Sequence, residues 1–294
     1  MNPNRTIRCR NEDGVSMTFG SGFNPFLLTD VVGIYGADAK VVTSENTMID
    51  GSTYQSSTMK LRNIVLTLRD RPTDDHRKMR EQLYSLFKFK SPGTLRITEN
   101  GVQRQIGYYV ENIHADSIKR SRVYTVSLLC PSPFFEDIAD TRVEMGGWTG
   151  GFTFRHIFTE EGETFGDRIT SMLETIVNTS ASENIGLRIV IDAIGEVMNP
   201  VITHVESGDF IQIGTENNPF TMQRGDRLTI TTGTANKHVL LTHSGQTEEI
   251  NQRMTGDSEF LQLKRGNNTF GYNAVSGAGN LIVTIFYRFL YEGI

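Results

Sequence analysis

The sequence predicts a mainly β protein with two domains, and two kinds of observation support this fold class. Short segments in which apolar and polar residues alternate recur along the chain, which is typical of half-buried strands. The 28 glycines against 8 prolines suit many short strands joined by turns. With 294 residues, the chain is long enough for two domains with separate cores.

Residues 61–135 contain the clearest succession of elements, beginning with a strand over residues 61–69. In that strand Ile64, Leu66 and Leu68 fall on one face, as the period of two requires. A second period-two segment, residues 122–130, ends at a proline-rich phrase. Because proline cannot donate to a sheet, we expect the strand to stop there.

One helix is predicted after the first of these strands. Thr73 is the expected N-cap, since its hydroxyl can accept an unpaired N–H of the first turn. Asp74 and Asp75 lie where the helix dipole favours negative charge, and Pro92-Gly93 is expected to end the helix. The apolar stripe of the helix consists of Met79, Leu83, Leu86 and Phe87.

Two hairpins are expected in the first half. Residues 94–98 and 102–113 flank Asn100-Gly101, a dipeptide that tolerates positive φ at both positions of a tight turn. Residues 36–60 carry few large apolar side chains. They form either a long exposed hairpin that a partner would order, or a mobile surface loop.

The second half shows regularly spaced short strands, which are typical of a sandwich or jelly roll. One segment, residues 165–176, is ambiguous. Its apolar residues fit a helical stripe, but its content of Thr, Ile and Val also fits a strand. The expected strands are residues 185–194, 201–205, 210–214, 227–231, 238–242, 259–264, 269–274 and 281–291, with breaks at Gly195, at Asn199-Pro200 and at residues 265–268.

The domain boundary is predicted just after Phe135. An acidic segment, residues 136–140, and a glycine-rich segment, residues 145–151, follow it. We therefore expect domains at residues 1–136 and 137–294.

Charge and composition exclude several classes of protein. Residues 1–140 carry 18 Lys and Arg against 16 Asp and Glu, and residues 141–294 carry 11 against 18, so the net charges are +2 and −7. Neither half has the basic excess of a nucleic-acid-binding protein. The N-terminal residues lack the apolar segment of a secretory signal, and no apolar run is long enough to span a bilayer. Cys9 and Cys130 are expected to be buried, reduced thiols.

No catalytic, cofactor or metal motif is recognised. His238 and His243 are five residues apart, which would put them on opposite faces of a strand, so metal binding there is weakly supported. Trp148 in its glycine-rich setting is a candidate for stacking on a sugar ring, with a structural anchor as the favoured alternative. Phe134-Phe135 either plugs an interface between subunits or packs within the chain.

Several phrases resemble the distal tail proteins of long-tailed bacteriophages, within the phage tail family. The most specific is Leu128-Leu129-Cys130-Pro131-Ser132-Pro133-Phe134-Phe135, which closes the first domain. The resemblance also favours strand over helix at residues 169–177. The other matching phrases are residues 57–64, 195–202, 224–230, 263–270 and 291–294.

This resemblance implies an N-terminal β-sandwich with one α-helix and a long hairpin, and a C-terminal β-sandwich of the galectin or carbohydrate-module type. It implies a homo-hexameric ring at the virion tail tip, made in the host cytoplasm, through which DNA passes. Its implied partners are the tail tube protein, a tail-tip hub or tail-associated protein and, in some members, receptor-binding proteins. The second half has no long insertion, so a dedicated arm for receptor-binding proteins is not expected.

Two other functions stay open on the residues alone. A carbohydrate-binding module would contact the host cell wall through the second domain, with Trp148 at the glycan. An enzyme such as a wall hydrolase would need paired carboxylates in a cleft, and no such pair is identified. We therefore expect a structural protein that is not an enzyme, needs no cofactor and does not insert into a membrane.

Overall fold

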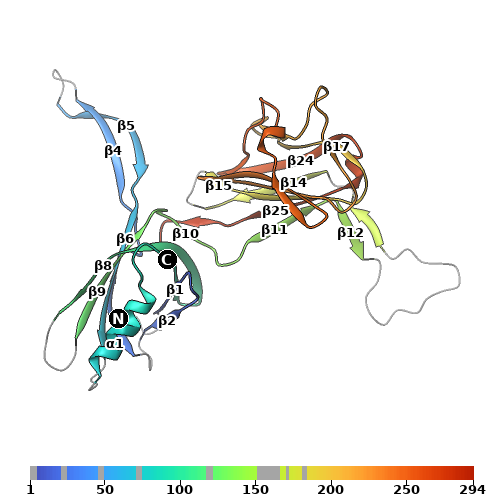
Figure 1. The fold of residues 1–294 in the computed structure, drawn as a ribbon. Helices are drawn as coiled ribbons and strands as arrows, with labels where there is room; N and C mark the ends of the chain where they lie inside the picture. The colour runs from blue at the N-terminus through green and yellow to red at the C-terminus, as the bar shows by residue number, and fades with distance from the viewer. Residues whose placement is uncertain are drawn as a thin grey trace. The chain divides into compact units, whose positions relative to one another are not determined.

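The computed structural model describes residues 5–20, 25–45, 50–70, 75–116, 122–150, 166–169, 172–180 and 184–294. The chain divides into two compact units, Met1–Ile138 with Leu290–Ile294, and Ala139–Phe289. Most described elements are strands, so the predicted mainly β class is confirmed (Figure 1). The return of the last five residues to the first unit was not predicted from the sequence.

The first unit is built on one antiparallel sheet. A parallel bridge between Gly20 and Leu27 joins the two ends of the strand order, so the sheet curls around its core. The expected N-terminal β-sandwich thus takes the form of a single curled sheet. Its strands follow the order β2 (Ser16–Phe19), β1 (Arg5–Asn11), β7 (Pro92–Glu99), β8 (Val102–Ala115), β9 (Val123–Cys130), β6 (Arg62–Asp70) and β3 (Phe26–Val32), and β10 (Phe135–Glu136) pairs with β8 and with β26 (Leu290–Tyr291).

The core of the first unit follows from the alternation seen in the sequence. Alternate residues of β6 and β9 are buried, and the predicted faces of both strands are confirmed. Burying one such side chain stabilises the fold by about 1.5–3 kcal/mol. The fully buried residues of these two strands include Ile64, Leu66, Leu68, Tyr124, Val126, Leu128 and Cys130.

Helix α1 (His76–Leu86) supplies the other side of this core through Leu83, Leu86 and the following Phe87. The predicted apolar stripe is confirmed, but the predicted ends are wrong. Asp75 caps the helix, because its carboxylate accepts the N–H of Lys78 at 3.0 Å. Thr73, the expected cap, lies outside the described residues.

The predicted end of the helix at Pro92-Gly93 is also wrong, since the helix stops at Leu86 and these two residues begin β7. Proline is tolerated at the first residue of a strand, where no ladder bond from its nitrogen is needed. The Asn100-Gly101 turn is confirmed, with φ of 51° and 85° at the two residues.

The second unit contains two main sheets that lie one above the other, which confirms the predicted sandwich (Figure 1). One sheet has the order β11 (Thr141–Met145), β25 (Leu281–Tyr287), β16 (Arg188–Ala193), β20 (Arg227–Gly233), β21 (Asn236–His243) and β22 (Gln246–Glu249). The other comprises β14 (Leu173–Asn178), β24 (Gly266–Ser276), β17 (Val197–His204), β18 (Phe210–Gln212) and β19 (Thr221–Met222). Smaller elements are the pairs β12 (Gly147–Gly150) with β13 (Gly166–Ile169) and β15 (Asn184–Gly186) with β23 (Gln262–Lys264), and the 3₁₀ turns η1 (Asn251–Arg253) and η2 (Ala278–Asn280).

Strand β17 corrects the predicted break at Asn199-Pro200. The strand runs through both residues, although Asn199 has a φ of 50°. The Asn199 side chain accepts the Phe220 N–H at 2.8 Å, and this long-range bond compensates for the unusual backbone. The ambiguous segment is resolved as strands β13 and β14, as the resemblance favoured.

A further correction concerns the turn predicted at residues 265–268, because β24 already begins at Gly266. Asn268 is fully buried, and its amide donates to the carbonyl oxygens of Lys264 and Gly266 at 2.7 and 2.8 Å. One side chain therefore holds the turn while its backbone already pairs with Ile176 of β14.

One buried arginine joins four segments of the first unit. Arg62 is 3 % exposed, and its guanidinium donates to the carbonyl oxygens of Gly33, Gly36 and Pro133 at 2.7–2.8 Å and to that of Glu292. The ring of Phe135 lies 4.9 Å from the guanidinium carbon. Phe135 is fully buried, so the alternative in which it packs within the chain holds for this residue.

Removing this cation should destabilise the first unit strongly. We expect Arg62→Ala to lower the free energy of unfolding by at least about 3 kcal/mol, because several buried carbonyls lose a charged donor. Urea denaturation measures the change. Arg69→Ala, on the exposed face of the same strand, is the matched control and should stay within about 0.5 kcal/mol of wild type. Equal effects of the two substitutions would contradict the role given to Arg62.

Cys9 and Cys130 are free and fully buried, which confirms the prediction for both thiols. Burial raises the pKa of the Cys130 thiol to about 12 and raises that of Cys9 as well. We expect no reaction with a disulfide reagent at pH 8 while the protein is native, and reaction of both thiols in guanidinium. Because the unfolded thiols ionise near pH 8.5, the free energy of unfolding should fall as pH rises above that value. If one thiol of the native protein reacted quickly with the disulfide reagent, this burial would be contradicted.

Candidate functional site: an exposed hairpin and the cavity at its root

The hairpin of the first unit has no core of its own. Strands β4 (Ala39–Glu45) and β5 (Ser52–Met59) form a separate two-stranded sheet. Every described residue of the two strands is exposed except Ser44, which is half-buried. Of the two alternatives for residues 36–60, the long exposed hairpin is confirmed.

This hairpin carries apolar side chains into solvent. Val41 is 56 % exposed and Tyr54 is 62 % exposed, and they lie on opposite strands of the hairpin, β4 and β5. A two-stranded ribbon is only marginally stable by itself in water, and its outer edges present unpaired N–H and C=O groups. These features are typical of a segment that another chain covers.

The root of the hairpin is firmly built. The Lys60 N–H donates to the Asp38 carbonyl at 2.8 Å and closes the base. Gly33 turns the chain out of β3 with a φ of 87°, and a Cβ there would lie 2.1 Å from the Asn63 carbonyl oxygen. Only glycine fits this position, so the direction in which the chain leaves β3 is fixed.

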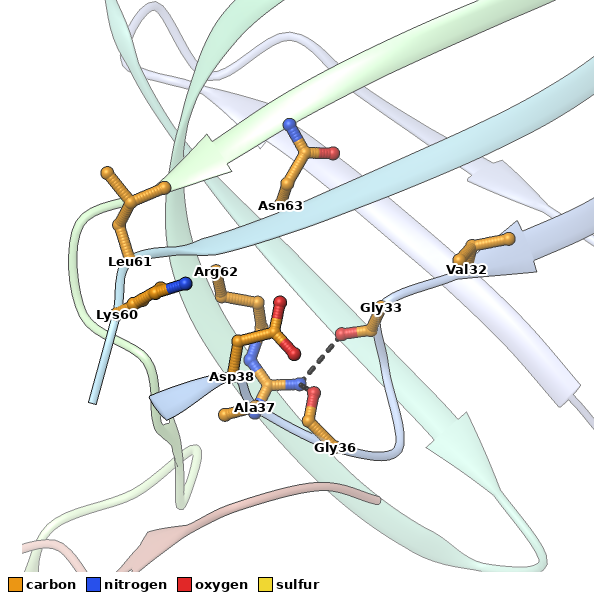
Figure 2. A pocket seen from close by; sticks show the side chains of 9 residues that line it. All are labelled: Val32, Gly33, Gly36, Ala37, Asp38, Lys60, Leu61, Arg62 and Asn63. Atoms are coloured by element: carbon orange, nitrogen blue, oxygen red, sulfur yellow. Dashed lines mark hydrogen bonds between the residues drawn. The ribbon is translucent and has the colours of Figure 1, made fainter. Parts of the chain in front are cut away.

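A cavity of about 650 Å³ lies at this root. Figure 2 shows the Arg62 guanidinium directed at the carbonyl oxygens of Gly33 and Gly36, with Asp38 and Lys60 nearby. Val32 and Leu61 at its border are 58 % and 54 % exposed. The arrangement pairs no nucleophile with a base, and its chemistry suits non-covalent contact with another chain.

The described histidines are each explained by local partners. His238 lies 2.6 Å from a Glu249 oxygen, and His243 lies 2.6 Å from an Asp226 oxygen, so the two histidines face two different carboxylates. His204 is buried between Ser207 and Asn268. Among the residues that the structure describes, no three His, Cys, Asp or Glu side chains are grouped as metal ligands.

Other residues singled out in the sequence are placed as follows. Trp148 lies on β12 opposite Arg168, and its side chain is outside the described part, so sugar stacking stays a prediction. Asp75 caps the helix, and Asp74 is not described. In the described ranges no helix is long and apolar enough to cross a bilayer.

Sequence reasoning missed Arg62, although one signal was present. Arg62 falls on the same face of the strand as Ile64, Leu66 and Leu68, so the alternation already placed an arginine at an inward position. Its carbonyl partners come from distant segments and have no local pattern.

Two family models match the chain, one for each half. The phage tail protein RIFT-related domain matches residues 17–130, and the C-terminal domain of siphovirus-type tail components matches residues 181–291. Together the two models account for well over half of the sequence. Among curated proteins, none matches this chain.

Solved structures share the fold at low sequence identity. The Dit protein (gp 19.1) of phage SPP1, described as a paradigm of the hub adsorption apparatus in phages that infect Gram-positive bacteria, has a TM-score of 0.68 and 11 % identity, over 97 % of this chain and 99 % of its own. A chain of the phage p2 baseplate, in its activated conformation with strontium, has a TM-score of 0.55 and 9 % identity, over 99 % of both chains.

The predicted resemblance is thus confirmed by independent matches to both halves and by a fold that extends over nearly the whole chain. The chain belongs to the phage tail family, as a distal tail protein of the siphovirus type.

Proposed function

We propose that this protein is a structural subunit of a phage tail tip, in which six copies close a ring that connects the tail tube to the tip proteins. The exposed β4–β5 hairpin is the observation that carries the proposal, since it is a built segment whose apolar residues nothing in its own unit covers. A contact between one patch and a different patch of the next copy is satisfied in every subunit only when the assembly closes.

The ring would let DNA pass without gripping it. Tight binding to DNA requires clustered Lys and Arg that neutralise phosphates. The first 140 residues have a net charge of only +2, which supports passage without strong retention. The family is one of structural tail proteins, and we propose no catalytic activity for this member.

The size of the protein in solution tests the ring. Six copies of the 33.0 kDa chain give a particle of about 198 kDa. We expect mass photometry to find this particle, alone or after addition of the tail tube protein, and electron microscopy to show sixfold symmetry. A protein that stays monomeric under both conditions would refute the proposal.

The hairpin should matter for assembly and not for folding. We expect the double substitution Val41→Ser and Tyr54→Ser to raise the protein concentration needed for ring formation at least tenfold, because apolar contacts to the neighbour are lost. The free energy of unfolding of the monomer, followed in urea, should change by less than about 0.5 kcal/mol.

Val275→Ser is the matched control for these substitutions. Val275 is 64 % exposed but lies in the second unit, so we expect both assembly and stability to be unchanged. Ring formation by the hairpin variant at wild-type concentrations would show that the hairpin is not part of the interface.

A further inference from the structure

Three arginines surround a second cavity of the first unit, of about 240 Å³. Arg8 and Arg10 come from β1 and Arg96 from β7, and Thr94 and Gln105 complete the lining. Arg8 and Arg10 alternate with the fully buried Ile7 and Cys9, so the cavity opens on the outer face of the curled sheet.

The strand register makes this cluster costly. Arg8 and Arg96 are direct cross-strand partners in the antiparallel pair of β1 and β7. Like charges at directly opposite positions destabilise a sheet, since their Cβ atoms lie only about 5 Å apart. A bound anion would remove this repulsion.

Two carboxylates near the cavity accept from groups other than its three arginines. Glu99 accepts from Arg5 at 2.8 Å, and Glu136 accepts from the Gln105 amide at 3.0 Å. Arg8 itself donates to the Ser16 hydroxyl at 3.1 Å. Within the described ranges, no carboxylate lies within 4.0 Å of the charged nitrogens of Arg8, Arg10 or Arg96.

The chemistry of the lining specifies the ligand. A guanidinium presents a planar set of N–H donors that matches a carboxylate or phosphate, often through two parallel bonds. Three guanidinium groups around a space of this size fit one or two oxyanion groups. The cavity therefore suits acidic side chains presented at the end of a narrow element.

Such an element exists in the chain itself. Glu45 ends β4 and Asp50 shortly precedes β5, and both are exposed near the far end of the hairpin. No described Lys or Arg forms an ion pair with either carboxylate. A strand of eight residues is roughly 26 Å long, which is enough to reach across to an adjacent molecule.

We propose that Arg8, Arg10 and Arg96 of one copy bind the carboxylates of Glu45 and Asp50 on the hairpin of a second copy, an inference that rests on the proposed ring. The hairpin leaves the curled sheet from β3 and β6, whereas the cavity lies over β1, β7 and β8. Donor and acceptor are thus different patches of one molecule, which is the head-to-tail arrangement that closes into rings. Because the hairpin residues are exposed, the hairpin does not lie on its own sheet.

Charge reversal separates this contact from folding. Arg8→Glu replaces a repulsive cross-strand pair with an attractive one, so the diluted monomer should melt at or above the wild-type temperature. The same variant should need at least tenfold higher concentration to form rings in mass photometry. If Arg8→Glu both lowers the melting temperature and prevents assembly, the substitution has damaged folding. In that case Arg96→Gln, which removes one charge without reversing it, is the test. It must weaken assembly at an unchanged melting temperature.

A charge swap identifies the occupant. We expect Glu45→Arg with Asp50→Arg to weaken assembly like Arg8→Glu with Arg96→Glu, and the combination of all four substitutions to restore it. Arg77→Glu with Lys78→Glu, at two exposed positions of α1, is the control and should assemble as wild type. If the arginine variant fails and the hairpin variant assembles normally, the carboxylates come from elsewhere and the proposal is wrong.

Two further outcomes are distinguishable. A wild-type protein that never assembles refutes the ring, whereas rings that tolerate every substitution refute only the arginine contact. The last measurement tests binding of a fluorescent DNA duplex. Binding of DNA that Arg8→Glu with Arg96→Glu abolishes would assign the cavity to phosphate and overturn the proposal.

Discussion

The first unit depends on a buried cation. Burying a guanidinium costs free energy unless its donors find acceptors, and Arg62 has four carbonyl acceptors only when three distant segments come together around it. Two of those acceptors, Gly33 and Gly36, belong to the segment that leads into the hairpin. The root of the hairpin is therefore held in place, although the hairpin's own strands contact no core.

The first unit thus presents an exposed hairpin that projects from a firmly built root. The arm carries apolar and acidic groups away from the sheet, and the outer face of the sheet carries a concentration of guanidinium groups on other strands. Neither surface has the geometry of a catalytic centre. In the proposed ring, both surfaces would make contacts that a single copy leaves unmade.

Much of the fold could be predicted from local patterns. The period of two located β6 and β9 with their buried faces, and the spacing of Leu83, Leu86 and Phe87 located the inner face of α1. The turn at Asn100-Gly101 followed from the need for positive φ. Two of the misses depend on long-range hydrogen bonds. The Phe220 N–H holds Asn199 within β17, and the carbonyl oxygens around Arg62 come from distant segments that leave no local pattern. The arginine cavity needs the register of β1 with β7, whose residues are almost ninety positions apart.

The C-terminal return has a consequence for how the protein is made. Strand β26 pairs with β10, and Arg62 and Arg104 hold the carbonyl oxygens of Glu292 and Gly293. The ribosome therefore synthesises the entire second unit before it supplies the last pieces of the first. A nascent chain can fold its later domain while the earlier one still lacks strand β26 and two carbonyl acceptors, so the first unit is completed only after the second has been synthesised.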